Sequence, residues 1–307
     1  MPKSSTQWPG GAPARKSSAK KILQEKDGQS ASDGDTLHVK QALRLVSCDT
    51  PESHYPTANS VDAATKKLKT CRERLEKGDY DAYLPRELRA YLLKRLTATA
   101  GKQQIDAANR AHDAFEKMLK NRLNKGGIKR QLGVLPTGEV IDSYGRMLAY
   151  LTPWFDSKKE TVPKDRAHPD RRTFNLQMVE EGWAAFFPIY GSLPTHRQDF
   201  DLGVKAARVA WKKKAGVWKL FGKNFLLGYE FRMCVKLGQP YKAKTGTSKA
   251  VTAKTLAEGA FARHCVDIST SKWKDVGLHG FWNVEPPNRL WFWSTDQKEA
   301  LKALGVK

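Results

Sequence analysis

The chain has 307 residues and carries 54 lysines and arginines against 32 aspartates and glutamates, a formal net charge of +22 at pH 7. That length supports one main domain with attachments, and the positive charge favours nucleic acid as a partner, although a merely solubilising charge would look the same. No stretch reaches the ~18 apolar residues of a transmembrane helix, and the N-terminus lacks the apolar region of a secretory signal. We therefore expect no membrane partner and a cytoplasmic location, with export by another route left open.

The N-terminal part of the chain changes from a low-complexity tail to strands. Residues 1–32 are rich in Ser, Lys, Gly and Pro, which predicts a disordered basic tail. From Asp33 to Thr50 the apolar residues favour two strands with a tight connection, and Pro51 ends the second. Charged side chains, among them Arg44, interrupt these apolar strands. Because charges are seldom buried without a partner, we expect a bound group between them.

Beyond these strands, the apolar residues recur at the spacing of a helix. It predicts a pair of helices within about 60–102 and a third helix from Ile105 to Leu119. The period then returns to two, and a turn at Pro136-Thr137-Gly138 predicts a hairpin from Lys129 to Leu151. Two more helices are expected, from Thr173 to Gly182 and from Thr195 to Lys214.

Residues 221–307 differ in character and predict a small accessory α+β region beside a main domain at 33–220. We interpret this region as an attachment whose removal weakens substrate binding or alters its selectivity without abolishing activity. Within it we expect three strands and a closing helix, at Phe225 to Leu237, Phe261 to Ile268, Arg289 to Trp293 and Thr295 to Leu304.

The charged residues can be combined into a site. Two aspartates about 5 Å apart repel each other by ~3 kcal/mol at an effective dielectric constant near 20, and a hard cation removes that cost. If the strands bring Asp35 and Asp49 together, they could hold Ca²⁺ with a backbone carbonyl. Glu52 could then activate a water as general base, while the guanidinium groups of Arg44 and Arg146 suit phosphate oxygens. Together these are the parts of metal-assisted phosphodiester hydrolysis.

A purely structural interpretation stays open at this point. Asp33 and Asp35 would form an Asx turn, and the arginines would pair with the acids as salt bridges. The D-G-D sequence by itself favours this simpler interpretation, so the order of further motifs must decide.

Four motifs occur in a specific order: D-G-D-T from Asp33, R-L-V-S-C-D-T-P-E from Arg44, D-S-Y-G-R-M-L-A-Y from Asp142 and F-N-L-Q-M-V-E-E-G-W-A from Phe174. Over roughly 33–52 and 142–220 the chain closely resembles the thermonuclease family, the staphylococcal nuclease-like proteins. The resemblance implies an α+β fold with a five-stranded OB-type β-barrel and three helices. It also implies Ca²⁺-dependent cleavage of DNA and RNA at the 5′ P–O bond, which leaves 3′-phosphates.

The resemblance assigns the metal and base residues by position. Asp35 and Asp49 match the calcium-binding carboxylates of the family, and Thr50 matches the residue that offers its backbone carbonyl. Glu52 matches the glutamate usually assigned as general base, and Asp33 matches a supporting aspartate. These assignments follow from the family motif alone.

The substrate-binding residues are assigned in the same way. Arg44 and Arg146 match the two arginines that clamp the phosphate, Tyr144 matches a tyrosine of the nucleotide pocket, and Tyr190 matches the second member of a Tyr-x-Tyr pair. The first member of that pair is Pro188 here. Base stacking is therefore expected to differ from the family pattern.

The segment between Glu52 and Asp142 is far longer than in the family and contains the helical pair expected at about 60–102. Because this insertion follows Glu52 directly, we expect it to cover the cleft and restrict entry to single strands or ends. The resemblance does not extend to 221–307.

We therefore hypothesise a calcium-dependent nuclease that acts on DNA, RNA or both, as a monomer without an obligate protein partner. The rival hypothesis is a non-catalytic nucleic-acid-binding or scaffold module built on the same barrel. The chain retains every charged position of the motif, at Arg44, Asp49, Glu52, Arg146 and Asp35, which favours hydrolysis.

Overall fold

The computed structural model describes residues 8–10, 30–31, 37–38, 41–56 and 60–306, and their fold is α+β, as the sequence predicts. Asp33 and Asp35 lie outside the described residues, as does most of the tail expected at 1–32. Of the helices that the structure describes, none combines the length and apolar character needed to cross a membrane.

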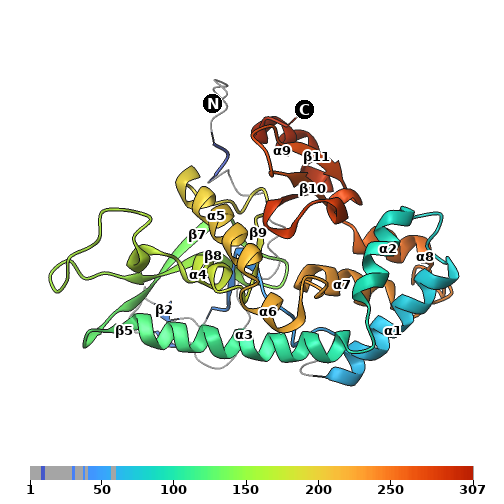
Figure 1. The fold of residues 1–307 in the computed structure, drawn as a ribbon, viewed down its shortest axis with the longest axis horizontal. Coiled ribbons are helices and arrows are strands. Elements are labelled where there is room, and N and C mark those ends of the chain that lie inside the picture. Colours follow the sequence, from blue (N-terminus) through green and yellow to red (C-terminus); the bar gives the residue numbers. More distant parts are fainter. Residues whose placement is uncertain (1–7, 11–29, 32–36, 39–40, 57–59, 307) are drawn as a thin grey trace.

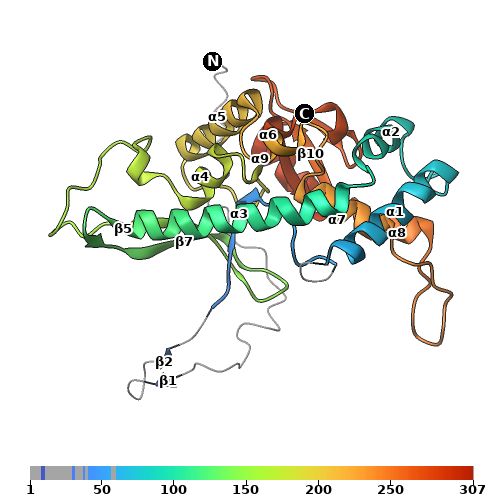
Figure 2. The ribbon, with the colours of Figure 1, turned by 60° about the horizontal axis from the view of Figure 1, so that its bottom comes forward.

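The helices include the pair expected in the insertion. The first begins at Ser60, whose hydroxyl accepts a hydrogen bond from the backbone of Ala63, and ends at Gly78 in the left-handed conformation that glycine adopts readily. The longest, α3, lies along one side of the molecule, and Figures 1 and 2 both show it passing from β5 to α1. The α-helices are α1 (Val61–Lys77), α2 (Arg86–Arg95), α3 (Ala100–Leu123), α4 (Phe174–Glu180), α5 (Arg197–Lys213), α6 (Val217–Phe221), α7 (Gly228–Leu237), α8 (Ala253–Ala260) and α9 (Gln297–Leu304), and the short 3-10 turns are Pro169–Arg171, Gly280–Asn283, Pro286–Asn288 and Ser294–Asp296.

The strands form small separate sheets. One has the order β3-β8-β7, another β11-β10-β12, and β4 pairs antiparallel with β9. No closed barrel is present among the described strands, so the five-stranded barrel stays a prediction. The strands are β1 (Ser30–Ala31), β2 (Leu37–His38), β3 (Leu43–Leu45), β4 (Ser47–Asp49), β5 (Asn124–Lys125), β6 (Ile128–Lys129), β7 (Gln131–Ile141), β8 (Met147–Trp154), β9 (Ala185–Phe187), β10 (Arg263–Asp267), β11 (Lys274–Gly277) and β12 (Arg289–Trp293).

The chain changes sheets between β3 and β4. Strand β3 runs parallel to β8, but at Ser47 the backbone takes a positive φ of 56°, and β4 then pairs with β9. The buried amide of Asn175 in α4 fixes this switch, because its Nδ2 donates to the carbonyls of Val46 at 2.9 Å and Ala149 at 3.1 Å. Its Oδ1 accepts from the backbone N of Leu151 at 3.0 Å. One satisfied side chain therefore holds the strand that delivers Asp49.

The turn of the β7–β8 hairpin was expected at the wrong place. Strand β7 continues through Pro136 with an irregular register, and the chain reverses at Asp142 to Arg146 instead. Asp142 stabilises this turn, because its Oδ1 accepts from the backbone N of Tyr144 at 2.9 Å and of Arg146 at 3.0 Å, while Gly145 takes a φ of 77°. The polar stretch that seemed to interrupt a strand is the hairpin turn itself.

The prediction of a strand from Phe225 to Leu237 was also wrong, because most of this segment is helix α7. Nearly every residue of α7 is buried. A short, mostly apolar run with several aromatic residues does not distinguish a buried helix from a strand. The strands expected near β10 and β12 and the closing helix near α9 are confirmed.

Residues 221–307 share their hydrophobic cores with the rest of the chain. In one core, Phe187 of β9 and Leu88 of α2 pack with Trp291 of β12. In the other, Phe200 of α5 lies in the same cluster as Phe292 of β12. Buried residues on both sides of position 220 therefore belong to the same clusters, and the division of the chain at 220 stays a prediction.

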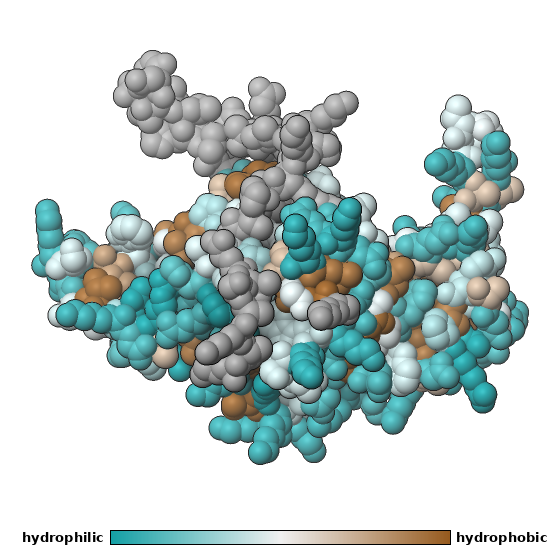
Figure 3. All heavy atoms as spheres, turned by 90° about the horizontal axis from the view of Figure 1, so that it is seen from above, coloured by the Kyte–Doolittle hydropathy of each residue, from teal (hydrophilic) through white to brown (hydrophobic). Residues whose placement is uncertain are grey.

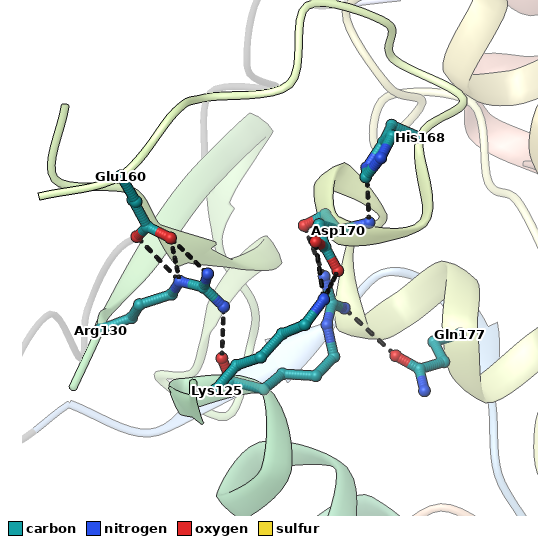
Figure 4. A network of polar contacts seen from close by, with 7 residues as sticks. Lys125, Arg130, Glu160, His168, Asp170 and Gln177 are labelled. Carbon is teal, nitrogen blue, oxygen red and sulfur yellow. Dashed lines mark hydrogen bonds and ion pairs between the residues drawn. The ribbon is translucent and has the colours of Figure 1, made fainter. Parts of the chain in front are cut away.

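The charged segment between β8 and α4 is held down by ion pairs. Figure 4 shows two ion pairs, one between Arg130 and Glu160 and one between Lys125 and Asp170. In the second pair, Nζ of Lys125 lies 2.5 Å from Oδ1 of Asp170. The ring of His168 accepts from the backbone N of Asp170 at 3.2 Å. These contacts tie the segment to the β5–β7 end of the molecule.

The visible surface agrees with the composition. In Figure 3, hydrophilic residues cover most of the face that is seen from above, and hydrophobic residues form small patches between them. The large exposed apolar side chains include Trp154, at 61 % exposure, and Leu135, at 48 %, both on the β7–β8 hairpin.

The shared cores predict one cooperative unfolding transition. Trp291→Ala should lower the free energy of unfolding of the whole chain by about 3–5 kcal/mol, because the removed ring is fully buried between both parts. Trp154→Ala, which truncates a ring that is 61 % exposed, should cost far less. Urea denaturation followed by circular dichroism would measure both, and two separate transitions of which only one moves would contradict the prediction.

Candidate functional site

Asp49 lies at the end of β4 with a side chain that is fully buried and bound by two arginines. Arg44 of β3 and Arg232 of α7 each place an Nη2 atom 2.9 Å from its Oδ1. The Arg44 pair joins residues of the sequence motif, whereas Arg232 comes from the C-terminal region. A buried carboxylate needs such partners, and here it has two on one oxygen.

Glu52 extends the same cluster beyond Pro51. Its Oε1 pairs with Nη1 of Arg232, and its side chain is 20 % exposed. Gln104 of α3 contacts the backbone of Glu52. In the amide orientation that gives both polar atoms of Gln104 a partner, the side-chain oxygen accepts a hydrogen bond from the backbone N of Glu52 at 2.6 Å. Arg232 thus bridges the two carboxylates that the sequence assigned to metal binding and base catalysis.

A third arginine lies near this bridge. Arg263 of β10 places its guanidinium 4.0 Å from the ring centre of Trp293, and its buried Nε has no hydrogen-bond partner among the residues that the structure describes. Burial and the neighbouring charges of Arg232 and Arg44 lower the pKa of Arg263 to about 10. Arg232 differs: burial lowers its pKa, but the carboxylates of Asp49 and Glu52 outweigh burial and raise it.

Arg146 and Tyr144 lie on the hairpin turn. The guanidinium of Arg146 is held by Asp142, with Nε 2.9 Å from Oδ2. Arg44 pairs with Leu148 across the sheet, and strand alternation places Arg146, two residues before Leu148, on the same face as Arg44. The side chains of both predicted phosphate-binding arginines therefore leave the sheet on one side.

Tyr144 is 78 % exposed, and its aromatic ring lies 5.1 Å from the guanidinium of Arg146. The hydroxyl of Tyr55 lies in the same neighbourhood: burial raises its pKa, and Tyr144, Arg232 and Glu52 all act on it electrostatically. The exposed tyrosine of the turn thus lies near the cluster, and its role as a nucleotide contact stays a prediction.

Tyr190 was predicted to contact the nucleotide, and the structure places it elsewhere. Its ring is buried, at 7 % exposure, and its hydroxyl donates to Glu299 of α9 at 2.8 Å. Burial and this carboxylate raise its pKa to about 12. The C-terminal region covers this tyrosine, which sequence motifs limited to 33–220 could not indicate.

The surroundings of Asp49 and Thr50 show whether these two residues, which the family motif suggests as calcium ligands, have room to bind an ion. A Cβ on Gly228, the first residue of α7, would lie 2.6 Å from Oδ2 of Asp49 and 2.3 Å from the carbonyl oxygen of Thr50. Both oxygens therefore face the backbone of α7 at close range, and Oδ2 has no hydrogen-bond partner within the described residues.

With Oδ1 held by two arginines and Oδ2 against α7, the described residues do not fit a calcium ion at Asp49. No group of three His, Cys, Asp or Glu side chains suited to a metal occurs in the described ranges. Asp35, the remaining predicted ligand, lies outside them.

A second buried network fixes α7 in this position. Arg289, at the start of β12, places Nη1 2.9 Å from Oε1 of Glu230, and the Tyr91 hydroxyl of α2 donates to the same oxygen at 2.5 Å. Glu230 Oε2 accepts from the Leu227 backbone at 3.2 Å, at the beginning of the helix. Because Gly228 and Arg232 are four residues apart, they share the other face, toward Asp49.

Sequence reasoning missed Arg232 and Arg263. The signal that singled out Arg44, an arginine within an apolar run, was also present at Arg232, in the run from Phe225 to Leu237. The incorrect strand prediction for that run hid which residues share a face, so the arginine was not connected with Asp49.

Comparison with known protein families gives one match. A family model described as a staphylococcal nuclease homologue covers residues 42–220, more than half of the chain. No curated protein matches the chain. The matched segment contains Arg44, Asp49 and Glu52 but ends before Arg232.

The close approach of α7 predicts that residue 228 must be glycine. Gly228→Ala should lower the free energy of unfolding by about 1–3 kcal/mol, because the new methyl group would meet the rigid Thr50 carbonyl. Gly259→Ala in α8 is the matched control, since its Cβ would meet only the flexible end of Lys236, and alanine favours helix. Urea denaturation compares the two, and equal stability of both variants would contradict this packing.

Proposed function

Because the chain belongs to the staphylococcal nuclease homologue family, we propose that it is a nuclease that hydrolyses the phosphodiester bonds of DNA, RNA or both. Family membership by itself supports a nuclease-like or nucleic-acid-binding module. The observation that carries the proposal is the cluster in which Arg44 pairs with Asp49 and Arg232 joins Asp49 to Glu52, with Arg146 on the same side of the sheet. The net charge of +22 supplies the attraction to a polyanion.

In the proposed reaction, Glu52 takes a proton from a water whose oxygen forms a bond to phosphorus. The bond from phosphorus to the 5′ oxygen breaks, and that oxygen leaves with the electron pair and takes a proton from solvent. The products are a 3′-phosphate and a 5′-hydroxyl. Glu52 suits this role because its side chain reaches solvent while Arg232 holds one of its oxygens.

The arginines bind the phosphate whose charge grows in the transition state. One nitrogen of Arg44 is used on Asp49, and the side chain is 32 % exposed, so further N–H groups face outward. Arg146, 36 % exposed, pairs with Asp142, which presents its guanidinium from the turn. Planar guanidinium groups match phosphate oxygens in pairs, which is the type of transition-state contact that accelerates hydrolysis.

Calcium dependence is general in the family, but the arrangement at Asp49 does not favour it here. The proposal therefore assigns no step to a metal, and the closed barrel and the 5′ P–O position of cleavage rest on the family resemblance. A purely binding role is the second candidate, since the ion pairs of Arg232 with Asp49 and Glu52 would also suit a stable, non-catalytic surface.

Cleavage of 5′-labelled DNA and RNA oligonucleotides, with identification of the 3′ end of the product, separates the two roles. The wild-type protein should release products with 3′-phosphates in a buffer with Ca²⁺, in a buffer with EDTA, or in both. Binding of the oligonucleotide without cleavage in either buffer would instead indicate the binding module.

Glu52→Gln should reduce kcat by about 10²–10⁴-fold, because the amide cannot accept the proton of the attacking water. The thermal unfolding midpoint should change little, since glutamine can still accept from Arg232. Glu76→Gln, at a half-exposed surface ion pair with Arg72, is the matched control and should keep full activity. If the Glu52 variant remains as active as this control, Glu52 is not the base.

Arg44→Lys should reduce kcat/KM by about 10²-fold or more, although the charge is kept, because lysine lacks the planar fork that holds Asp49 and phosphate together. Arg110→Lys, on the exposed face of α3, controls for the chemical change. Steady-state kinetics on the oligonucleotides measure both variants. Loss of activity together with unfolding would show that the Arg44–Asp49 pair is structural only.

A further inference from the structure

The oxygens that the family motif assigns to a metal are covered by the start of α7. At Gly228 only a hydrogen fits between the helix backbone and the two oxygens, Oδ2 of Asp49 and the carbonyl of Thr50. A metal ion that bound both oxygens would have to displace helix backbone rather than a side chain. The positive end of a helix dipole lies at this point, which itself favours the carboxylate.

The remaining carboxylate oxygens already hold a cation. Arg232 spans Oδ1 of Asp49, at 2.9 Å, and Oε1 of Glu52, and its side chain is 26 % exposed. A guanidinium offers five N–H donors, and the two contacts leave others for a further acceptor. Arg232 therefore stands where a bridging cation would stand and still reaches the solvent side.

The charge balance of the cluster favours an anion over a second cation. Among the residues that the structure describes there, Arg44, Arg232 and Arg263 supply three positive charges against the two negative charges of Asp49 and Glu52. The side chain of Arg263 makes no ion pair or hydrogen bond that the described residues show. A divalent ion in this cluster would meet the repulsion of each arginine twice as strongly as a monovalent one.

The helix that carries Arg232 is anchored from several sides. Glu230 binds Arg289 and Tyr91 on the opposite face, and the backbone carbonyl of Leu237 accepts from the hydroxyl of Tyr80 at 2.5 Å and from Nη1 of Arg74 at 2.8 Å. Both ends of α7 are thus held by polar contacts to the helical insertion. The placement of Arg232 is a property of the fold rather than of one loose side chain.

We propose that Arg232, assisted by Arg263, takes the place of the divalent cation, so that this site binds the phosphodiester backbone of nucleic acid without Ca²⁺. The inference deepens the proposed function and rests on it for the substrate class. It goes beyond the family match, because both arginines lie outside the matched segment.

Two measurements test the metal and the phosphate separately. The first is calorimetric titration of the full chain with CaCl₂ alone, in which no binding heat is expected. The second is fluorescence anisotropy of a labelled single-stranded DNA oligonucleotide with hydrolysis-resistant phosphorothioate linkages, in which the Kd should be equal in EDTA and in Ca²⁺. Arg232→Gln should weaken that Kd by about tenfold or more, as expected for a lost charge-assisted contact.

Lys236→Gln is the matched control, since it removes one positive charge from the same helix at a side chain that contacts α8. Arg263→Gln keeps the test valid if the Arg232 variant unfolds, because Arg263 makes no ion pair with the carboxylates and its loss should also weaken binding. Thermal unfolding of each variant accompanies the titrations.

Saturable Ca²⁺ binding by the wild-type chain, together with DNA binding or cleavage that requires it, would overturn the inference and make Arg232 a displaceable occupant of a metal site. Equal DNA affinities of the Arg232, Arg263 and Lys236 variants would overturn it as well. Absence of cleavage under all conditions would reject only the nuclease proposal, because calcium titration and DNA affinity are measured without turnover.

Discussion

The structure depends on the charge balance around the buried carboxylate of Asp49. One oxygen meets Arg44 and Arg232, and the other meets the start of α7 at Gly228. Removing one partner of a buried ion pair typically costs about 3–5 kcal/mol, because the remaining charge stays desolvated. Strand β4, helix α7 and strand β3, which carries Arg44, are therefore fixed relative to one another by a single side chain.

The residues of this arrangement that lie close in sequence could be predicted. Arg44, Asp49 and Glu52 fall within nine positions of one family motif, which is sufficient to expect them together, although strand alternation alone would place Arg44 and Asp49 on opposite faces and the positive φ of Ser47 is what joins them. The helical insertion and the helices α4 and α5 were also predictable, because each has one apolar face. In these cases a local pattern determines the local structure, and the structure confirms it.

The hairpin turn and helix α7 could not be predicted, because no local sequence pattern contains the information that fixes them. The hairpin turn at Asp142 was missed because its stabilisation comes from side-chain contacts to Tyr144 and Arg146, whereas Pro136 gave a stronger turn signal. Helix α7 was missed because a short, mostly apolar run does not distinguish a buried helix from a strand. Its contact with Asp49 joins residues about 180 positions apart, and neither spacing nor composition indicates such a pairing.

The two departures from the family pattern, the helical insertion and the C-terminal region, act as one unit. Tyr91 and Tyr80 come from the insertion, and they bind Glu230 and Leu237 at opposite ends of α7. Neither part alone could place Arg232 on Asp49, since α7 without the insertion would lose partners at both ends. The insertion therefore orients the helix that completes the charge of the site, while its suggested role as a cover over the cleft stays a prediction.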